Sequence, residues 1–165
     1  MEDLSMDCIE LFQFIEIPID EEDFKIIMLQ IMKALKQMAS MDIHYMDIKP
    51  ENIMINTETL QVKLIDFESV VYGEMEYLQK RIGTKGFISP ENFQKKTYRI
   101  KPSKVFSLGC LMYFCMENQE TDLIWNSEEN RSFIFCSPLL QDLINQCLKY
   151  EPEARIEFDN ILHHN

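Results

Sequence analysis

An apolar stripe between Phe24 and Met41 constrains the fold of this chain more than any other feature. Seven apolar side chains recur there at intervals of three and four residues: Phe24, Ile27, Met28, Ile31, Met32, Leu35 and Met38. Lysines fill positions between them, so one face is apolar and the other charged. This period predicts a helix that buries one face in a core. The acidic run 20–23 precedes the stripe, where carboxylates favour a helix start.

Weaker helical patterns lie on either side of this stripe. A short amphipathic helix is predicted within Asp7–Glu16, and further helices are predicted over Lys104–Met116, Leu139–Tyr150 and Ile156–His164. The stretch from Glu68 to about Arg99 is polar and irregular. A connection of that length inside a compact domain is usually functional.

Two short alternating runs, Ile53–Asn56 and Gln61–Ile65, flank the residues 57–60 and predict a small β-hairpin. The expected fold class is therefore mostly α with this one hairpin. The length of 165 residues suits one domain with its own core, and no internal repeat or shift in composition divides it. We therefore expect a single domain over residues 1–165.

The charge and the cysteines exclude several classes of protein. With 28 acidic and 16 basic residues, the formal charge is −12, which disfavours binding to nucleic acid and to anionic membrane surfaces. The five cysteines are scattered and form no C-x-x-C pair, so neither a disulfide framework nor a zinc site is expected. The apolar runs are too short to cross a bilayer. These features favour an intracellular protein of the cytoplasm or nucleus, with no membrane partner.

Several short motifs follow the long helix in a fixed order. The first is Asp47-x-Lys49-x-x-Asn52. The motifs after it are Leu64-Ile65-Asp66-Phe67, Gly83-Thr84-Lys85-Gly86-Phe87-Ile88-Ser89-Pro90-Glu91, Phe106-Ser107-Leu108-Gly109-Cys110 and Leu148-x-x-x-Pro152-x-x-Arg155. A single D-x-K-x-x-N string is weak evidence, but four further motifs in order make coincidence implausible.

From about Cys8 to His164, the sequence resembles the C-terminal lobe of a eukaryotic serine/threonine protein kinase. The segments Cys8–Ile15, Asp47–Ile55 and Val62–Ser69 are most similar to the PIM kinases. Residues 1–7 resemble the hinge between the two lobes of such an enzyme. The expected fold is thus a kinase-like C-terminal lobe over residues 8–165, with the N-terminal lobe absent.

The resemblance implies a role for each residue of the first two motifs. Asp47 would accept the proton of the attacking hydroxyl, and Lys49 would neutralise the transferred phosphate. Asn52 and Asp66 would hold Mg²⁺, and Met54 would pack under the adenine of ATP. The alternative is structural: Asp47, Lys49 and Asn52 would stabilise their own loop, and Asp66 would cap nearby amides.

The remaining motifs imply contacts rather than chemistry. By the same resemblance, Thr84 would lie near Asp47 and Lys49, as in enzymes specific for serine and threonine. Glu91 would pair with Arg155 and so tie the end of the activation segment to the last helical region.

Five positions depart from the family pattern. The family's His-Arg-Asp reads Tyr45-Met46-Asp47, so the arginine that clasps a phosphorylated activation loop is missing. Glu68 replaces the glycine after the metal-binding aspartate and adds negative charge near the phosphates. Lys104 replaces a helix aspartate that accepts hydrogen bonds from the catalytic loop. The replacement of a tryptophan by Phe106 is milder.

The sequence also contains no G-x-G-x-x-G to cover the phosphates of ATP. A kinase needs that loop, a strand lysine and a helix glutamate to position the nucleotide. The favoured interpretation is a degenerate, PIM-like pseudokinase lobe that binds another protein kinase or a kinase substrate through an exposed cleft. The expected apolar surface of this cleft comprises the Met46–Met54 region, the hairpin and the Asp66-Phe67 corner. The alternative is a fragment or truncated isoform of an active kinase that transfers the γ-phosphate of ATP to protein serine or threonine.

Overall fold

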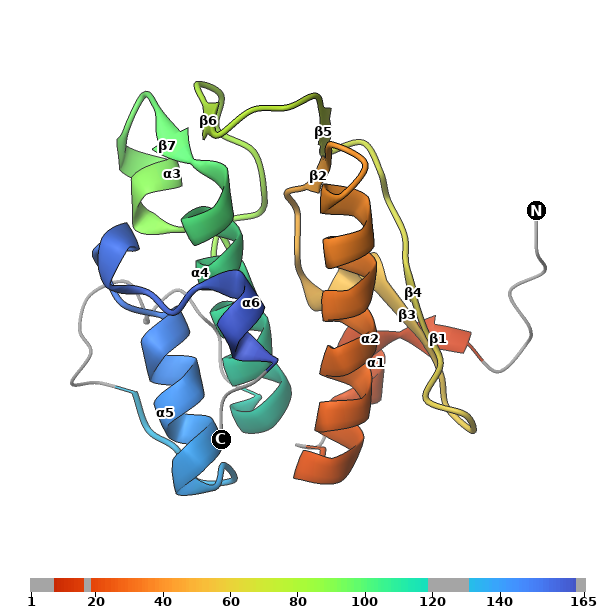
Figure 1. Ribbon diagram of the computed structural model, residues 1–165. Helices are drawn as coiled ribbons and strands as arrows, with labels where there is room; N and C mark the ends of the chain where they lie inside the picture. The colour runs from red at the N-terminus through yellow and green to blue at the C-terminus, as the bar shows by residue number, and fades with distance from the viewer. Residues whose placement is uncertain (1–7, 17–18, 119–130, 163–165) are drawn as a thin grey trace.

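The computed structural model describes residues 8–16, 19–118 and 131–162 (Figure 1). In chain order the elements are β1 Cys8–Glu10, α1 Leu11–Phe14, α2 Glu21–Ala39, β2 Ile43–Tyr45, the 3-10 helix η1 Pro50–Asn52, β3 Ile53–Asn56, β4 Val62–Leu64, β5 Val70–Tyr72, β6 Tyr77–Leu78, α3 Pro90–Gln94, β7 Tyr98–Arg99, α4 Ile100–Glu117, α5 Pro138–Cys147, the 3-10 helix η4 Pro152–Ala154 and α6 Phe158–Ile161. The expected hinge residues 1–7 lie outside these ranges.

The apolar stripe forms α2, as predicted. Asp20 caps its N-terminus, where the side chain accepts hydrogen bonds from the amides of Glu22 and Asp23 at 2.9 Å. The apolar residues of the stripe from Phe24 to Leu35 are all buried. The helix therefore starts at the acidic run, where carboxylates favour it, and presents one face to the core.

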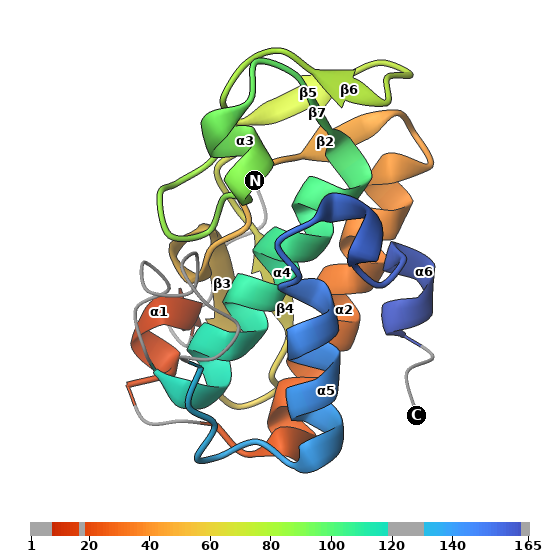
Figure 2. The same cartoon turned by 90° about the vertical axis from the view of Figure 1, so that its left-hand side faces the viewer.

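Helix α4 forms the centre of the helical part and lies between α2 and α5 (Figures 1 and 2). Nearly all of its residues are buried, so it shows no polar face. A Cβ added at Gly109 would come within 2.8 Å of Cys147 and 2.9 Å of Leu148. Glycine at this position therefore lets α5 approach α4 closely.

The predicted hairpin is present, as the antiparallel pair β3 and β4. The predicted helix over Asp7–Glu16 is wrong in its first part, because Cys8–Glu10 forms β1 on the other side of β3. Only Leu11–Phe14 is helical. Pairing with a distant strand edge outweighs the local helical pattern here.

The stretch from Glu68 to Arg99 is less irregular than predicted. Strand β5 pairs with β2, and β6 pairs with β7, both antiparallel. These strands have two or three residues each, and their partners are distant in sequence or across a helix. Such short, non-local pairs leave no periodic signal. The described residues thus contain three small sheets rather than one hairpin.

The C-terminal helices are shorter than predicted. Helix α5 ends at Cys147 instead of Tyr150, and a separate turn, η4, follows it. Of the predicted helix Ile156–His164, only Phe158–Ile161 is helical, and residues 163–165 lie outside the described ranges. No helix within residues 8–16, 19–118 and 131–162 is both long and apolar enough to span a membrane.

Candidate active site

A hydrogen-bonded network joins the loop after β2 to the segment before α3. The Lys49 ammonium lies 3.2 Å from an Asp47 carboxylate oxygen and donates to the Thr84 hydroxyl at 2.9 Å. That hydroxyl donates to the other Asp47 oxygen at 2.8 Å. The structure thus brings Asp47, Lys49 and Thr84 together, although they span 37 positions of sequence. A carboxylate and an ammonium beside each other form an arrangement that can orient a hydroxyl and balance a phosphate charge.

Asn52 holds Asp47 in place from the other side. Its side-chain amide donates to the Asp47 backbone oxygen and to its carboxylate, both at 3.0 Å. Asn52 ends η1, whose first residue, Pro50, has the fixed φ that suits a helix start. Both Asn52 and Asp47 are buried. The structural role that the sequence left open for Asn52 is therefore present.

Gly83 lets the Thr84 segment approach this network. Its φ is +114°, and a Cβ there would lie 2.5 Å from Ile88 Cγ2 and 3.2 Å from the Met46 carbonyl oxygen. A side chain would thus meet both unfavourable backbone geometry and a steric clash.

Gly83→Ala is therefore expected to lower the free energy of unfolding by about 2–4 kcal/mol, as measured by chemical denaturation. Gly73→Ala is the matched control, because Gly73 has a φ of +113° but its added Cβ would meet only the end of Met75 at 3.6 Å. Gly73→Ala should lower the free energy of unfolding by about 1 kcal/mol, from backbone strain alone. Equal losses in the two variants would contradict the close approach at Gly83.

Asp66 follows β4 and is exposed, with a left-handed φ of +54°. Aspartate tolerates this conformation better than most residues. One carboxylate oxygen accepts a hydrogen bond from the Glu68 amide at 3.2 Å. Asn52 and Asp66 flank the same end of the β3–β4 hairpin, and the Ile65 amide donates to the Asn52 carbonyl at 2.9 Å. The capping interpretation of Asp66 is thus present, while its second oxygen remains open to solvent or a metal.

Met54 lies on β3, between partners in β1 and β4. The side chains of this strand alternate, so Ile53 and Ile55 are buried while Met54 is partly exposed. Met54 therefore faces the open side of the sheet, where a flat apolar group could pack on it.

Tyr45 has a role that the sequence did not reveal. Its side chain is almost fully buried, and the phenol donates to the Ile65 carbonyl. Its ring packs edge-on against Phe67, with ring centres 5.7 Å apart. Burial raises the pKa of the Tyr45 phenol, and the carboxylates of Asp47 and Asp66 raise it further. Tyr45 thus remains a neutral donor that links the loop of Asp47 to the segment of Asp66.

Met46 is buried in a small apolar cluster separate from the main core. The cluster contains Met46, Leu78, Tyr98 and Ile100, with Val71 and Ile82 packed against it. Met46 lies in the loop of Asp47, and all the others except Ile82 lie in β5, β6, β7 and the start of α4. Apolar packing therefore attaches the segment after Asp66 to the loop of Asp47. At the position where the family pattern has an arginine, Met46 therefore makes apolar contacts that need no phosphate.

The expected pair of Glu91 and Arg155 is present and buried. The guanidinium makes two bonds to the Glu91 carboxylate, at 2.6 and 2.8 Å. It also donates to three backbone carbonyls, those of Pro102, Lys149 and Tyr150. Phe106 packs beneath it, with 4.8 Å between the guanidinium carbon and the ring centre. This one side chain thus connects α3, the start of α4 and the region of η4.

Lys104 is only 4% exposed and makes no ion pair with any described residue. Its ammonium lies 5.9 Å from the centre of the Phe158 ring. Burial, with a contribution from Lys101, lowers the pKa of Lys104 to about 8. Lys104 thus offers no hydrogen-bond acceptor to the backbone of the Asp47 loop, as the sequence implied.

The donor chemistry of this site suits Mg²⁺ in part. Asn52 and Asp66 offer the oxygen ligands that this hard cation prefers, and bound Mg²⁺ would neutralise phosphate charge. Among the described residues, no group of three or more histidine, cysteine or acidic side chains is arranged to hold a metal. The described residues also contain no glycine-rich loop to enclose the phosphates of ATP. The site therefore fits a metal held jointly with a nucleotide better than a metal held by protein alone.

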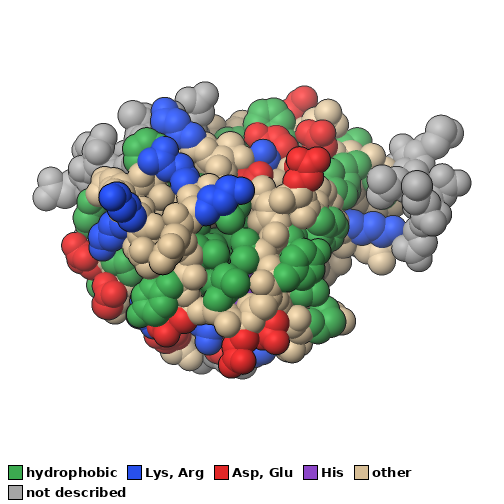
Figure 3. Space-filling model, turned by 90° about the horizontal axis from the view of Figure 1, so that it is seen from above, with side chains coloured by type: hydrophobic (Ala, Val, Ile, Leu, Met, Phe, Trp, Pro, Cys, Tyr) green, Lys and Arg blue, Asp and Glu red, His purple; other side chains and the backbone are tan. Residues whose placement is uncertain are grey.

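The exposed apolar surface agrees with the expected cleft only in part. The prediction fails for much of the Met46–Met54 region, because Met46, Ile48 and Ile53 are each at most 3% exposed. At the Asp66-Phe67 corner it is confirmed, because Phe67 is 53% exposed. Four of the large exposed apolar residues lie on and after the Asp66 segment: Phe67, Tyr72, Met75 and Tyr77. Figure 3 shows hydrophobic side chains in the middle of the face that contains β5, β6 and β7, with charged side chains around them.

Comparison with known proteins agrees with these observations. The sequence matches the protein kinase domain over residues 3–165. It is 29% identical to the serine/threonine-protein kinase dkf-1 of Caenorhabditis elegans, over 99% of this chain and 25% of that protein. It is 30% identical to the serine/threonine-protein kinase cds1 of Schizosaccharomyces pombe, over 88% of this chain and 36% of that protein. With the serine/threonine-protein kinase pim-2 of Danio rerio, the identity is 32% over 95% of this chain and 52% of that protein. The chain thus spans between a quarter and about half of these relatives.

Proposed function

Because the chain belongs to the protein kinase domain family, we propose that it is a degenerate, PIM-like serine/threonine kinase lobe that acts by binding. Its 165 residues would not transfer phosphate unaided. They would bind another protein kinase or a kinase substrate inside the cell, in the cytoplasm or nucleus. The resemblance of three segments to PIM kinases, together with the 32% identity to pim-2, supports the subgroup.

The observation that favours this proposal most is the environment of Asp66. The residue after Phe67 is Glu68, an exposed carboxylate, and its amide bonds the Asp66 side chain at 3.2 Å. A further negative charge beside the candidate metal ligand opposes the approach of triphosphate. No phosphate loop in these 165 residues offsets that repulsion, and positioning is the main source of catalysis in phosphoryl transfer.

A second function is favoured by the network around Asp47. Asp47, Lys49, Asn52 and Thr84 are connected by bonds of 2.8–3.2 Å, so the part of the site that acts on the hydroxyl is assembled. Joined to a lobe that supplies a glycine-rich loop and a lysine, this chain would contribute the catalytic loop of an active serine/threonine kinase that uses ATP and Mg²⁺. In that case Asp66 and Asn52 would hold the metal, and Met54 would contact the adenine.

Nucleotide binding distinguishes the two functions. If the chain acts by binding protein alone, its melting temperature should change by less than about 1 °C in millimolar ATP with Mg²⁺, because no bound nucleotide stabilises the folded state. Glu68→Gly, which restores the family glycine, should increase any response. A shift of several degrees that Asp66→Asn abolishes would favour the active enzyme.

Protein binding is tested through the exposed apolar side chains beside Asp66. The purified chain should form a stable complex with a protein kinase or a kinase substrate, and Phe67→Ser should weaken that complex at least tenfold, because Phe67 is 53% exposed. Leu139→Ser, which removes a similarly exposed side chain from α5, is the control and should leave binding unchanged. Equal affinities of the two variants would contradict this binding face.

A further inference from the structure

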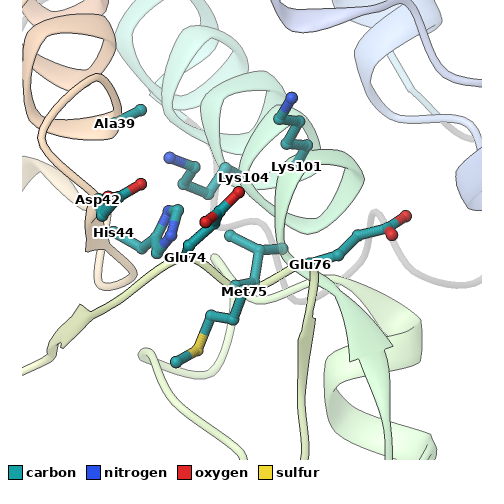
Figure 4. A pocket seen from close by; sticks show the side chains of 9 residues that line it. Ala39, Asp42, His44, Glu74, Met75, Glu76, Lys101 and Lys104 are labelled. Atoms are coloured by element: carbon teal, nitrogen blue, oxygen red, sulfur yellow. The ribbon is translucent and has the colours of Figure 1, made fainter.

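A pocket of about 590 Å³ lies between the end of α2, the start of β2, the β5–β6 connection and the start of α4 (Figure 4). It is separate from the Asp47 network. Its wall includes six ionisable residues from three segments: Asp42, His44, Glu74, Glu76, Lys101 and Lys104. Neither the phosphotransfer chemistry nor the proposed binding face uses these residues.

Lys104 is the most unusual member of this wall. It is 4% exposed, and no carboxylate lies within 4.0 Å of its ammonium among the described residues. Glu76 is engaged elsewhere, because it pairs with Arg99 at 3.1 Å. Asp42 and Glu74 line the pocket without reaching ion-pair distance of Lys104. A buried cation without a counter-ion favours its neutral, nucleophilic form.

His44 provides a second unpaired group in the same pocket. It is 9% exposed, and its Nε2 lies 3.2 Å from the Gly73 carbonyl oxygen. A carbonyl only accepts, so Nε2 must carry the proton and Nδ1 keeps its lone pair. Nδ1 is buried and has no hydrogen-bond partner. His44, which lines the pocket, thus keeps a buried proton acceptor that the described residues do not satisfy.

The charges around both groups favour their neutral forms. Burial and Lys101 lower the pKa of Lys104 to about 8. Burial lowers the pKa of His44, and Lys104 lowers it further, whereas the bond to Gly73 and the Asp42 charge oppose this shift. Near pH 8 an amine nucleophile and an imidazole acceptor therefore coexist in the lining of one pocket of about 590 Å³.

We propose that Lys104 is a site of covalent modification, at which a short acyl group is taken from an acyl thioester. The neutral Nζ of Lys104 attacks the thioester carbonyl carbon, and the carbon–sulfur bond breaks. The nitrogen loses one proton to His44 Nδ1, which passes it to the departing thiolate. The products are an amide at Lys104 and a free thiol. The amide removes the buried charge.

The test is the reaction of the folded chain with the acetyl thioester of N-acetylcysteamine at pH 8, with acetylation of each lysine measured by mass spectrometry. Lys104 should react about tenfold faster than Lys33, an exposed lysine on α2, because the lowered pKa of Lys104 leaves a large fraction of its amine neutral at this pH. In 6 M guanidinium this preference should disappear. A Lys104 rate at or below that of Lys33 in the folded chain would overturn the proposal.

The role of His44 is tested separately with His44→Leu, which keeps a side chain of similar size. This variant should lower the rate at Lys104 at least fivefold and leave the rate at Lys33 unchanged. An unchanged rate at Lys104 would overturn the assignment of His44 as proton acceptor. Circular dichroism of the variant confirms that the fold is retained while the rates are compared.

Discussion

Replacing Arg155 by methionine is expected to lower the free energy of unfolding by about 3–5 kcal/mol. The guanidinium bonds both oxygens of Glu91 and three backbone carbonyls, and Arg155 is only 6% exposed. Methionine keeps much of the apolar volume over Phe106 but leaves the Glu91 carboxylate buried without a cation. That unpaired charge, more than the lost pair itself, is the source of the effect. Urea denaturation at pH 7 measures it.

Arg99→Met is the matched control for this change. Arg99 pairs with Glu76 at 3.1 Å, but both side chains are exposed, so removal should cost at most about 1 kcal/mol. The double variant Glu91→Gln/Arg155→Met should be more stable than Arg155→Met alone, because it leaves no buried charge. A loss at Arg155 no larger than the loss at Arg99 would contradict the structural role of the buried pair.

Replacing Lys104 by methionine should have the opposite sign and stabilise the fold at neutral pH. The pKa of Lys104 is about 8 in the fold, against 10.5 as its ordinary value. Below pH 8 the fold must therefore bury an ammonium that the unfolded chain keeps in water. By linkage, this difference in pKa lowers the free energy of unfolding by about 3 kcal/mol at pH 7. Lys104→Met should therefore raise the free energy of unfolding by up to about that amount.

The stabilisation by Lys104→Met depends on pH. A lysine with a lowered folded-state pKa destabilises the fold at low pH, and this penalty fades as the pH rises from 8 towards 10.5. The gain from Lys104→Met should therefore shrink by about 2 kcal/mol between pH 7 and pH 9.5.

Other groups titrate in the same pH range, but their effect on stability is the same in the unmodified chain and in Lys104→Met. Burial raises the pKa of the Cys115 and Cys147 thiols to about 12, which lowers stability at high pH equally in both proteins. Lys33→Met, at an exposed position of α2, should change stability by no more than about 0.5 kcal/mol at either pH. A gain at Lys104 that stays constant with pH would show that the lysine does not titrate in this window.

The sequence predicts those parts of the fold that depend on local pattern. The apolar period of α2 and the alternation of β3 and β4 are signals within one segment, and both elements are present. Strand β1 was missed because its pairing depends on β3, more than 40 residues away. The pairs β2–β5 and β6–β7 were missed for the same reason, since two or three residues of strand show no period.

The candidate site follows a similar division. The motifs identified Asp47, Lys49, Asn52 and Thr84 as candidate site residues, and hydrogen bonds in the fold connect them. The contacts of Tyr45 and Met46 could not be read from sequence, because they involve Ile65, Phe67 and Leu78 on other segments. The pocket of Lys104 and His44 was missed because its walls come from four separate segments.

The most direct test of the proposed function is the rate of phosphate transfer from ATP with Mg²⁺ to a serine peptide by the purified 165-residue chain. The same rate is measured for Asp47→Asn, which keeps the shape of the side chain but removes the carboxylate. If the lobe acts by binding, the two proteins should show the same rate, at the background of the assay. Transfer by the unmodified chain that falls at least a hundredfold in Asp47→Asn would contradict the account and identify an active kinase.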